Sequence, residues 1–161
     1  MGWVCAALGA DGRLRACALG PTKAAALAAC GVRRADPSPE GPLKALRADL
    51  ARYFAGERVD LGRHPVDLSG QPPFHRGALL AAREIPYGEV RTYGWVAARA
   101  GNPSAARAAG AAMSRNPIGL FIPCHRVVGA GGDLTGFGGG LPLKRALLAL
   151  EGVRIGGRRC G

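Results

Sequence analysis

The pattern of apolar and polar residues at the start of the chain predicts a β-hairpin followed by a helix. The apolar stretches WVCAAL at 3–8 and RLRACAL at 13–19 flank a turn with the sequence GADG at 9–12. An Asp-Gly pair is favoured in hairpin turns because their central residues need positive φ angles. The run TKAAALAAC at 22–30 is then typical of a helix, which we expect to end at Gly31.

A second helix is predicted for the segment that begins near residue 43. Its apolar residues recur with helical spacing, and charged residues occupy the other face. These apolar residues are Leu43, Leu46, Leu50, Tyr53 and Phe54. Between Gly56 and Pro73 the chain is rich in prolines, glycines and polar residues, which predicts a connector that crosses the surface without forming an element.

The second half of the chain is predicted to be mostly helical. Apolar residues at 74–82 indicate a helix that ends before Pro86. Two further helices, TYGWVAARAG and SAARAAGAAMS, share the segment 92–114, with Thr92 and Ser104 as their N-caps and Gly-Asn-Pro between them. This is a helix-turn-helix pattern. Proteins that never touch DNA also contain such pairs, so the pattern alone leaves both interpretations open.

The last third of the chain combines a predicted strand, a glycine-rich segment and a helix. GLFI at 119–122 predicts a buried strand, and LPLKRALLALEG at 141–152 predicts the helix. We expect Lys144 and Arg145 to face the solvent. The opposite, buried side should consist of Leu143, Leu147 and Leu150.

Glu151 stands at the C-terminal end of this predicted helix, just before Gly152. The helix dipole places partial negative charge there, which disfavours a carboxylate. A glutamate at this position therefore needs a compensating partner, such as a hydrogen bond to a histidine.

The composition supports a basic protein with one domain or two small ones. A chain of 161 residues can bury a real core. The net charge is +11, of which residues 1–70 carry +3 and residues 71–161 carry +8. This balance favours a polyanionic partner, with a solvated basic surface as the alternative. No apolar run reaches the roughly 18 residues of a membrane span, and five scattered cysteines without a C-x-x-C pair favour a reducing cytoplasm.

Cys124 and His125 stand side by side before the glycine-rich segment. A cysteine reacts as its thiolate, and an ordinary thiol with a pKa of about 8.5 is only slightly ionised at neutral pH. A histidine can accept the thiol proton, and a carboxylate can orient that histidine. Neighbouring side chains rarely point at each other, so we expect a bridging water. The alternative is an inert buried cysteine in a tight turn before a flexible loop.

These residues resemble the O6-alkylguanine-DNA alkyltransferases, also called methylated-DNA–protein-cysteine methyltransferases. Several motifs occur in the order and spacing of that family, from about Phe74 to Gly152. They are IPCHRV at 122–127, IPYGEV at 85–90, TY at 92–93, GNPSAARAAGAAMSRNP at 101–117, TGFGGG at 135–140 and LLALEG at 147–152.

The resemblance implies five catalytic residues. Cys124 would attack the alkyl carbon on guanine O6, and the thioether product would consume the protein. His125 would activate Cys124 through a water, and Glu151 would orient His125. Asn116 would brace the turn of the active site, and the hydroxyl of Tyr93 would bind the flipped base at N3 and assist its departure.

The resemblance also implies a DNA surface and a base pocket. Arg107 would enter the base stack as the finger that replaces the flipped nucleotide, with its helix in the minor groove. The surrounding DNA-binding residues would be Tyr93, Ala105, Ala106, Ala108, Gly110 and Arg115. The pocket would be formed by Met113, Val127, Leu134, Phe137, Gly138 and Gly139.

The chain departs from the family pattern at several positions. Phe137 replaces a usual tyrosine, which keeps an aromatic wall and removes a hydroxyl. Leu79 and His75 replace a common tryptophan and glutamine, which affects local packing. Some relatives carry metal ligands in the first module, but the cysteines and histidine here form no recognisable ligand set, so we expect neither a metal nor a cofactor. These residues are Cys5, Cys17, Cys30 and His64.

The expected protein is thus an α/β module at 1–70, ending in a connector, followed by a mostly α-helical alkyltransferase and DNA-binding domain at 71–161. Its partner would be double-stranded DNA with O6-alkylguanine, and O4-alkylthymine is a second candidate lesion. We expect a monomer in the cytoplasm of a bacterial or archaeal cell, acting at the nucleoid. Two alternatives are a lesion-binding protein that does not transfer the alkyl group and a thiol hydrolase that uses Cys124, His125 and Glu151.

Overall fold

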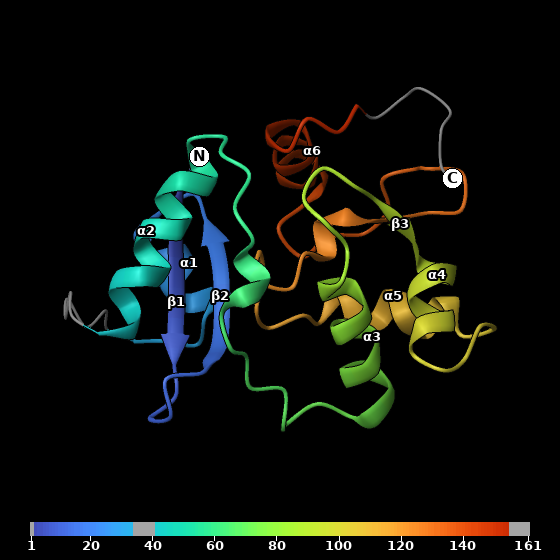
Figure 1. Cartoon of the computed structure of the whole chain (residues 1–161), viewed down its shortest axis with the longest axis horizontal. Coiled ribbons are helices and arrows are strands. Elements are labelled where there is room, and N and C mark those ends of the chain that lie inside the picture. Colours follow the sequence, from blue (N-terminus) through green and yellow to red (C-terminus); the bar gives the residue numbers. More distant parts are fainter. Residues whose placement is uncertain (1, 34–40, 155–161) are drawn as a thin grey trace. The chain divides into compact units, whose positions relative to one another are not determined.

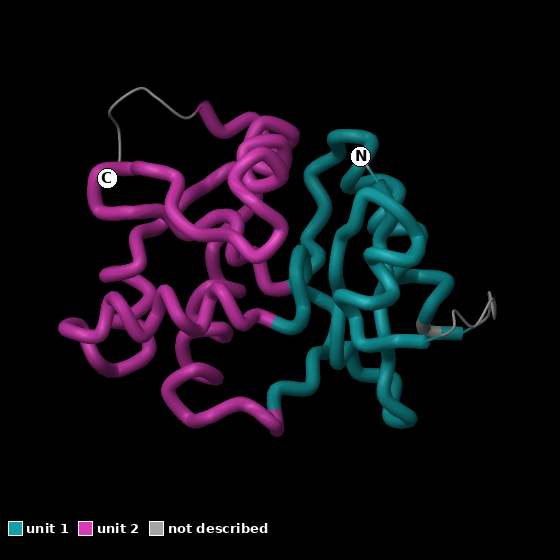
Figure 2. Tube along the Cα trace, turned by 180° about the vertical axis from the view of Figure 1, so that it is seen from behind, with its two compact units in different colours: residues 1–68, 117–121 teal, residues 69–116, 122–161 magenta. Residues whose placement is uncertain are grey.

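The structure is a computed structural model that describes residues 2–33 and 41–154 (Figure 1). The chain divides into two compact units, coloured separately in Figure 2. Unit 1 consists of Met1–Leu68 and Pro117–Phe121, and unit 2 consists of Ser69–Asn116 and Ile122–Gly161. The chain therefore leaves unit 2 after Asn116 and returns to it at Ile122.

Unit 1 begins with the predicted hairpin. Strand β1 (Trp3–Leu8) pairs with strand β2 (Leu14–Gly20) in antiparallel register, with a shift after Ala7. In the turn, Gly12 has a φ of 76°, a conformation that glycine adopts without steric cost. The hairpin prediction is confirmed.

Two helices complete the α/β arrangement of unit 1. Helix α1 (Lys23–Ala29) is capped by Thr22, whose Oγ1 accepts a 3.1 Å hydrogen bond from the Ala25 N–H. Helix α2 (Pro42–Phe54) buries Leu46 and Tyr53. Both helices were expected from the spacing of their apolar residues, and both predictions are confirmed.

The segment at 56–73 is more ordered and more buried than a surface connector. It contains the short 3₁₀ helix η1 (Leu61–Arg63), and Val66 forms a bridge with Leu14 of β2. Its apolar side chains Val59, Leu61 and Leu68 are buried. The prediction of a connector without an element is wrong here, because these apolar residues leave the solvent and the backbone pairs with β2.

Unit 2 is built on three helices that pack against one another. They are α3 (Pro73–Arg83), α4 (Tyr93–Arg99) and α5 (Ala106–Ser114). Their contacts are lined largely by small residues that allow the helices to approach closely. The buried side chains include Ala78, Leu79, Ala82, Val96, Ala97, Ala109, Ala112 and Met113.

The short strand β3 (Arg91–Thr92) pairs in parallel with β4 (Val127–Val128), and helix α6 (Leu141–Leu150) follows. The pairing of β3 and β4 joins the start of α4 to the segment that follows Cys124. The small two-stranded sheet with helices in the first part, and the helices that dominate the second, confirm the predicted fold class (Figure 1). No helix within 2–33 and 41–154 is long and apolar enough to cross a membrane.

The N-caps of the two helices at 92–114 differ from each other. Thr92 caps α4 as predicted, with its Oγ1 accepting a 3.1 Å hydrogen bond from Trp95 N–H. The N-cap of α5 is Ala105, and Ser104 instead donates a 2.8 Å hydrogen bond to Asn102 Oδ1. The prediction for Ser104 is wrong because its hydroxyl finds a side-chain acceptor within the turn.

Residues 119–122 do not form the predicted strand. Leu120 has a φ of 69°, and the Phe121 N–H bonds to the Gly119 carbonyl at 2.9 Å, so the backbone turns. Leu120, Phe121 and Ile122 are buried as expected. Burial was read correctly from the apolar residues, but their order does not reveal the turn.

Candidate active site

Cys124 lies in a tight turn that is almost completely buried. The 3₁₀ helix η2 (Cys124–Arg126) follows Pro123 and leads directly into β4. The Cys124 N–H bonds to the Ile122 carbonyl at 2.8 Å, and the Arg126 N–H bonds to the Pro123 carbonyl at 2.9 Å. The backbone thus holds three chemically active side chains in a fixed turn.

His125 and Glu151 form a hydrogen bond, as expected from the unfavourable position of Glu151 at the C-terminal end of a helix. The distance from His125 Nε2 to Glu151 Oε1 is 2.7 Å, and both side chains are buried. Burial opposes ionisation of Glu151, but His125 and Arg126 outweigh it and lower the carboxyl pKa to about 2. An ionised Glu151 can only accept, so Nε2 carries the proton in this bond.

The other ring nitrogen of His125, Nδ1, is buried and hydrogen-bonds to no protein atom in the described part of the chain. Burial lowers the pKa of His125, while Glu151 opposes this effect. The imidazole is therefore neutral, with its proton on Nε2 and a lone pair on Nδ1. A neutral histidine in this tautomer can accept a proton at Nδ1.

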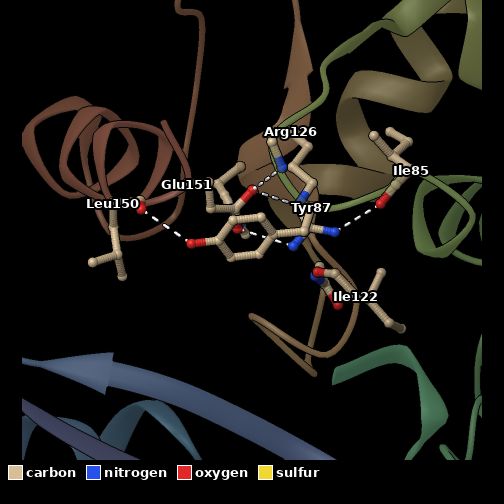
Figure 3. Close-up of polar contacts among 9 residues, drawn as sticks. Ile85, Tyr87, Ile122, Arg126, Leu150 and Glu151 are labelled. Carbon is tan, nitrogen blue, oxygen red and sulfur yellow. Dashed lines mark hydrogen bonds and ion pairs between the residues drawn. The ribbon is translucent and has the colours of Figure 1, made fainter. Parts of the chain in front are cut away.

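Arg126 holds Glu151 in place (Figure 3). Its Nε bonds to Glu151 Oε2 at 2.8 Å, its Nη2 bonds to Oε1 at 2.9 Å, and its Nη1 bonds to the Ile85 carbonyl at 2.7 Å. Gly88 N–H adds a 3.2 Å bond to Oε2. This set of donors offsets the unfavourable position of Glu151 at the C-terminal cap of α6.

Tyr87 completes this cluster and was not singled out from the sequence. Its hydroxyl donates a 3.1 Å hydrogen bond to the Leu150 carbonyl at the end of α6, and its ring lies 5.8 Å from the Arg126 guanidinium (Figure 3). Tyr87 thereby joins the Pro-Tyr-Gly turn to the helix that presents Glu151. The motif IPYGEV was visible in the sequence, but Leu150, whose carbonyl Tyr87 contacts, lies 63 positions away.

Asn116 supports the turn that carries Cys124. Its Nδ2 donates a 2.8 Å hydrogen bond to the Ile122 carbonyl. Burial raises the pKa of the Cys124 thiol, and the Asn116 side chain, the charge of Lys144 and nearby backbone N–H groups each oppose that rise. The thiol is therefore protonated in the resting protein, and it needs a base before it can react.

Lys144 does not face the solvent, contrary to the prediction for α6. It is fully buried, and its Nζ donates hydrogen bonds to the Val127 carbonyl at 2.6 Å and the Thr135 carbonyl at 2.9 Å. Arg145 is exposed as expected. The amphipathic pattern failed at Lys144 because two backbone carbonyls satisfy its ammonium inside the protein.

The residues expected to contact DNA lie on α4, on α5 and at the two caps of α5. Arg107 and Arg115 are exposed and lie outside the hydrogen-bonded cluster of Glu151. Tyr93 begins α4, its ring lies beside Gly110, and its hydroxyl donates a 3.4 Å hydrogen bond to the Thr135 carbonyl. The remaining small residues on this surface, all partly exposed, are Ala105, Ala106 and Ala108.

The residues expected to form a base pocket differ in exposure. Met113 and Val127 are buried, and Leu134 and Phe137 are partly exposed. The rest are exposed glycines, Gly138 and Gly139. A Cβ on Gly139 would lie 2.6 Å from a Leu143 methyl group and 3.1 Å from the Phe137 ring, so these side chains would have to shift to admit a larger residue there.

The cysteines and the histidine of unit 1 have other partners. Cys30 Sγ donates to the Cys5 carbonyl at 3.0 Å, and burial raises the pKa values of the Cys17 and Cys30 thiols. His64 Nε2 lies 2.7 Å from Asp49 Oδ2. Within 2–33 and 41–154, no three His, Cys, Asp or Glu side chains are placed to hold a metal ion.

Known sequences are similar to the part of the chain that carries this site. A family model described as "6-O-methylguanine DNA methyltransferase, DNA binding domain" matches residues 73–153. The chain is 52% identical over 102 residues to a Mycolicibacterium paratuberculosis protein named methylated-DNA--protein-cysteine methyltransferase, which covers 63% of this chain and 61% of the relative. A protein of the same name from Methanosarcina acetivorans is 51% identical over 104 residues, covering 64% and 65%. The chain thus spans less than two thirds of the length of these relatives.

Solved structures extend the similarity to the fold. Mycobacterium tuberculosis OGT in complex with DNA aligns with a TM-score of 0.68 and 37% identity, over 89% of this chain and 84% of that chain. The O6-methylguanine-DNA methyltransferase of Pyrococcus kodakaraensis strain KOD1 aligns with a TM-score of 0.66 and 25% identity, over 88% of each chain. The resemblance noted in the sequence is confirmed, and the chain belongs to the 6-O-methylguanine DNA methyltransferase family.

Proposed function

We propose that this protein repairs O6-alkylguanine in double-stranded DNA by transferring the alkyl group irreversibly to Cys124. The observation that carries the proposal is the buried arrangement of Cys124, His125 and Glu151, in which His125 keeps a lone pair on Nδ1. All the residues to which we assign a role belong to unit 2. The family membership supports this reaction over other uses of a buried thiol.

The first step is transfer of the Cys124 thiol proton through a water to His125 Nδ1. Glu151 stabilises the resulting imidazolium through its 2.7 Å bond to Nε2. Arg126, Gly88 and Tyr87 support the reaction by fixing Glu151 and the helix end that carries it. The raised pKa of the buried thiol makes this base necessary.

The thiolate then attacks the alkyl carbon on guanine O6. The Sγ–C bond forms as the C–O6 bond breaks, and the electrons of that bond remain on guanine. The Tyr93 hydroxyl donates its proton to N3 as guanine departs. The proton held by His125 then passes through solvent to the Tyr93 oxygen. The thiol proton has thus passed to guanine, and the thioether leaves no thiol for a second turnover.

The base would be recognised largely by backbone groups. The carbonyls of Cys124 and Val127 would accept from the guanine amino group, and Gly138 N–H would donate to O6. The Val127 carbonyl already accepts from Lys144, and a carbonyl oxygen can accept a second hydrogen bond. Phe137 and Gly139 would form the wall of the slot.

The DNA would bind along α5. Extrusion of the damaged nucleotide costs a few kcal/mol, which a wedge and a fitted pocket can offset. Arg107 is exposed on this helix and can enter the stack, and the small residues beside it permit close approach in the minor groove. The net charge of +11 suits contact with phosphates, so we expect affinity to fall steeply with salt.

Mass spectrometry distinguishes this reaction from its alternatives. Incubation with duplex DNA that contains O6-methylguanine should add one methyl group to the peptide with Cys124, in a burst that stops at one equivalent. Cys124→Ala should abolish transfer and leave DNA binding nearly intact. Loss of methyl from DNA while Cys124 stays unmodified would refute the proposal. Binding without transfer would indicate a lesion-recognition protein, and continued turnover would indicate a thiol hydrolase.

A further inference from the structure

Lys144 is the buried cation that the proposed reaction leaves unexplained. A lysine is almost never fully buried unless its ammonium is satisfied by partners. Here Nζ donates to the carbonyls of Val127 and Thr135 and lies 5.9 Å from the centre of the Tyr93 ring. An amide side chain could donate hydrogen bonds to these carbonyls at a lower desolvation cost. The hydrogen bonds alone therefore do not explain why the residue is charged.

The two hydrogen bonds join separate parts of the site. Val127 follows η2 directly and begins β4, whereas Thr135 lies in the glycine-rich segment between β4 and α6. The Thr135 carbonyl also accepts from the Tyr93 hydroxyl. One ammonium therefore holds the backbone after Cys124, the glycine-rich segment and the side of α4 close together.

The charge of Lys144 also acts on the reactive pair. Burial raises the pKa of the Cys124 thiol, and the charge of Lys144 opposes that rise. Burial also lowers the pKa of His125, and the charge of Lys144 adds to that fall. Burial lowers the pKa of Lys144, the charge of Cys124 opposes that fall, and the resulting pKa is about 8. Lys144 is thus mainly charged at pH 7, and the titratable groups that face it are Cys124, His125 and the Tyr93 phenol.

We propose that Lys144 is a positioning residue of the Cys124 site, whose buried ammonium anchors the glycine-rich segment to β4 and stabilises the Cys124 thiolate. The inference deepens the proposed alkyl transfer and rests on it for its biological meaning. A cation at this position favours the nucleophilic form of the thiol without taking up its proton. His125 accepts that proton, and Lys144 makes the anion left behind less costly in a buried site.

The test measures the thiol itself, with iodoacetamide as the probe and the peptide containing Cys124 as the readout. Lys144→Met should raise the apparent pKa of Cys124 by about one unit or more, because an opposite charge nearby shifts a pKa by roughly 1–3 units. The alkylation rate at pH 7 should fall about three- to tenfold, because a smaller fraction of the thiol is ionised. The fall is smaller than the loss of thiolate, since a more basic thiolate is also a better nucleophile. Arg145→Met removes a charge from the exposed side of the same helix and should change neither value.

An unchanged Cys124 pKa in folded Lys144→Met would overturn the proposal. If that variant does not fold, Lys144→Gln, which removes the charge but keeps an amide donor, is tested by the same measurement. An unchanged Cys124 pKa in Lys144→Gln would overturn the proposal as well. Neither measurement uses alkylated DNA, so a failure of methyl transfer and a failure of the Lys144 inference are separate results.

Discussion

Replacing Glu151 by glutamine should destabilise the protein strongly at neutral pH and much less in acid. The carboxyl is buried, which opposes its ionisation, but its bonds to His125 and Arg126 lower its pKa from 4.5 to about 2. Because the pKa in the folded state lies below that of the unfolded chain, the ionised carboxylate stabilises the fold above about pH 4.5. This contribution disappears as the pH falls toward 2, and glutamine lacks it at every pH.

The expected magnitude follows from the same values. The difference between 4.5 and about 2 corresponds to about 3–4 kcal/mol of unfolding free energy, at roughly 1.4 kcal/mol for each pKa unit. Removal of the carboxylate also leaves the buried Arg126 guanidinium without its counter-ion, a change that typically costs about 3–5 kcal/mol. Both figures describe one interaction, so they should not be added. We expect a loss of about 3–4 kcal/mol at pH 7.

Urea unfolding of both proteins from about pH 7 down to the lowest pH at which both are folded measures this loss. The gap between the two proteins should narrow steadily as the pH falls below about 4.5. Glu84→Gln is the control, because Glu84 forms its ion pair with Arg99 on the exposed surface and should contribute at most about 1 kcal/mol. A gap of constant size across the pH range would mean that Glu151 acts through packing, and the electrostatic reasoning would be refuted.

Three further substitutions test other parts of the site. Tyr87→Phe keeps the ring beside Arg126 but removes the hydrogen bond to the Leu150 carbonyl, so thermal unfolding should show a loss of about 1 kcal/mol; no loss would mean that water replaces the hydroxyl. Gly88→Ala combines a φ of 80° with a Cβ placed 3.1 Å from the Glu151 carbonyl, and should cost about 1–2 kcal/mol, whereas a more stable variant would contradict this geometry. Arg107→Ala should slow repair of duplex DNA far more than reaction with free benzylguanine, and equal losses on both substrates would argue against a role in nucleotide flipping.

The buried polar residues show why local sequence patterns reach only part of this site. Glu151 stands where a helix dipole disfavours it, and that local conflict correctly indicated a histidine partner. Tyr87 and Lys144 cause no such conflict in the sequence. Their roles depend on carbonyl groups supplied by distant parts of the chain, which periodicity cannot indicate.

Two errors in the predicted elements have a similar origin. Ser104 is a good N-cap residue, but its hydroxyl bonds to Asn102 and α5 begins two residues later. The apolar residues at 119–122 are buried, but Leu120 adopts a positive φ and the backbone turns. Composition indicates burial, whereas the choice between a strand and a turn depends on which backbone partners are available.

The hairpin, the main helices, the family and the residue types of the reactive pair could be predicted from the sequence, because each leaves a local pattern or a motif with fixed spacing. Which polar groups are satisfied in the interior depends on the tertiary structure. It gave Glu151 the donors that keep it ionised, left a lone pair on His125 Nδ1, and buried the Lys144 ammonium against the Val127 carbonyl. The physical reason is that a buried charge is tolerated only where the partners brought by the whole fold offset its desolvation.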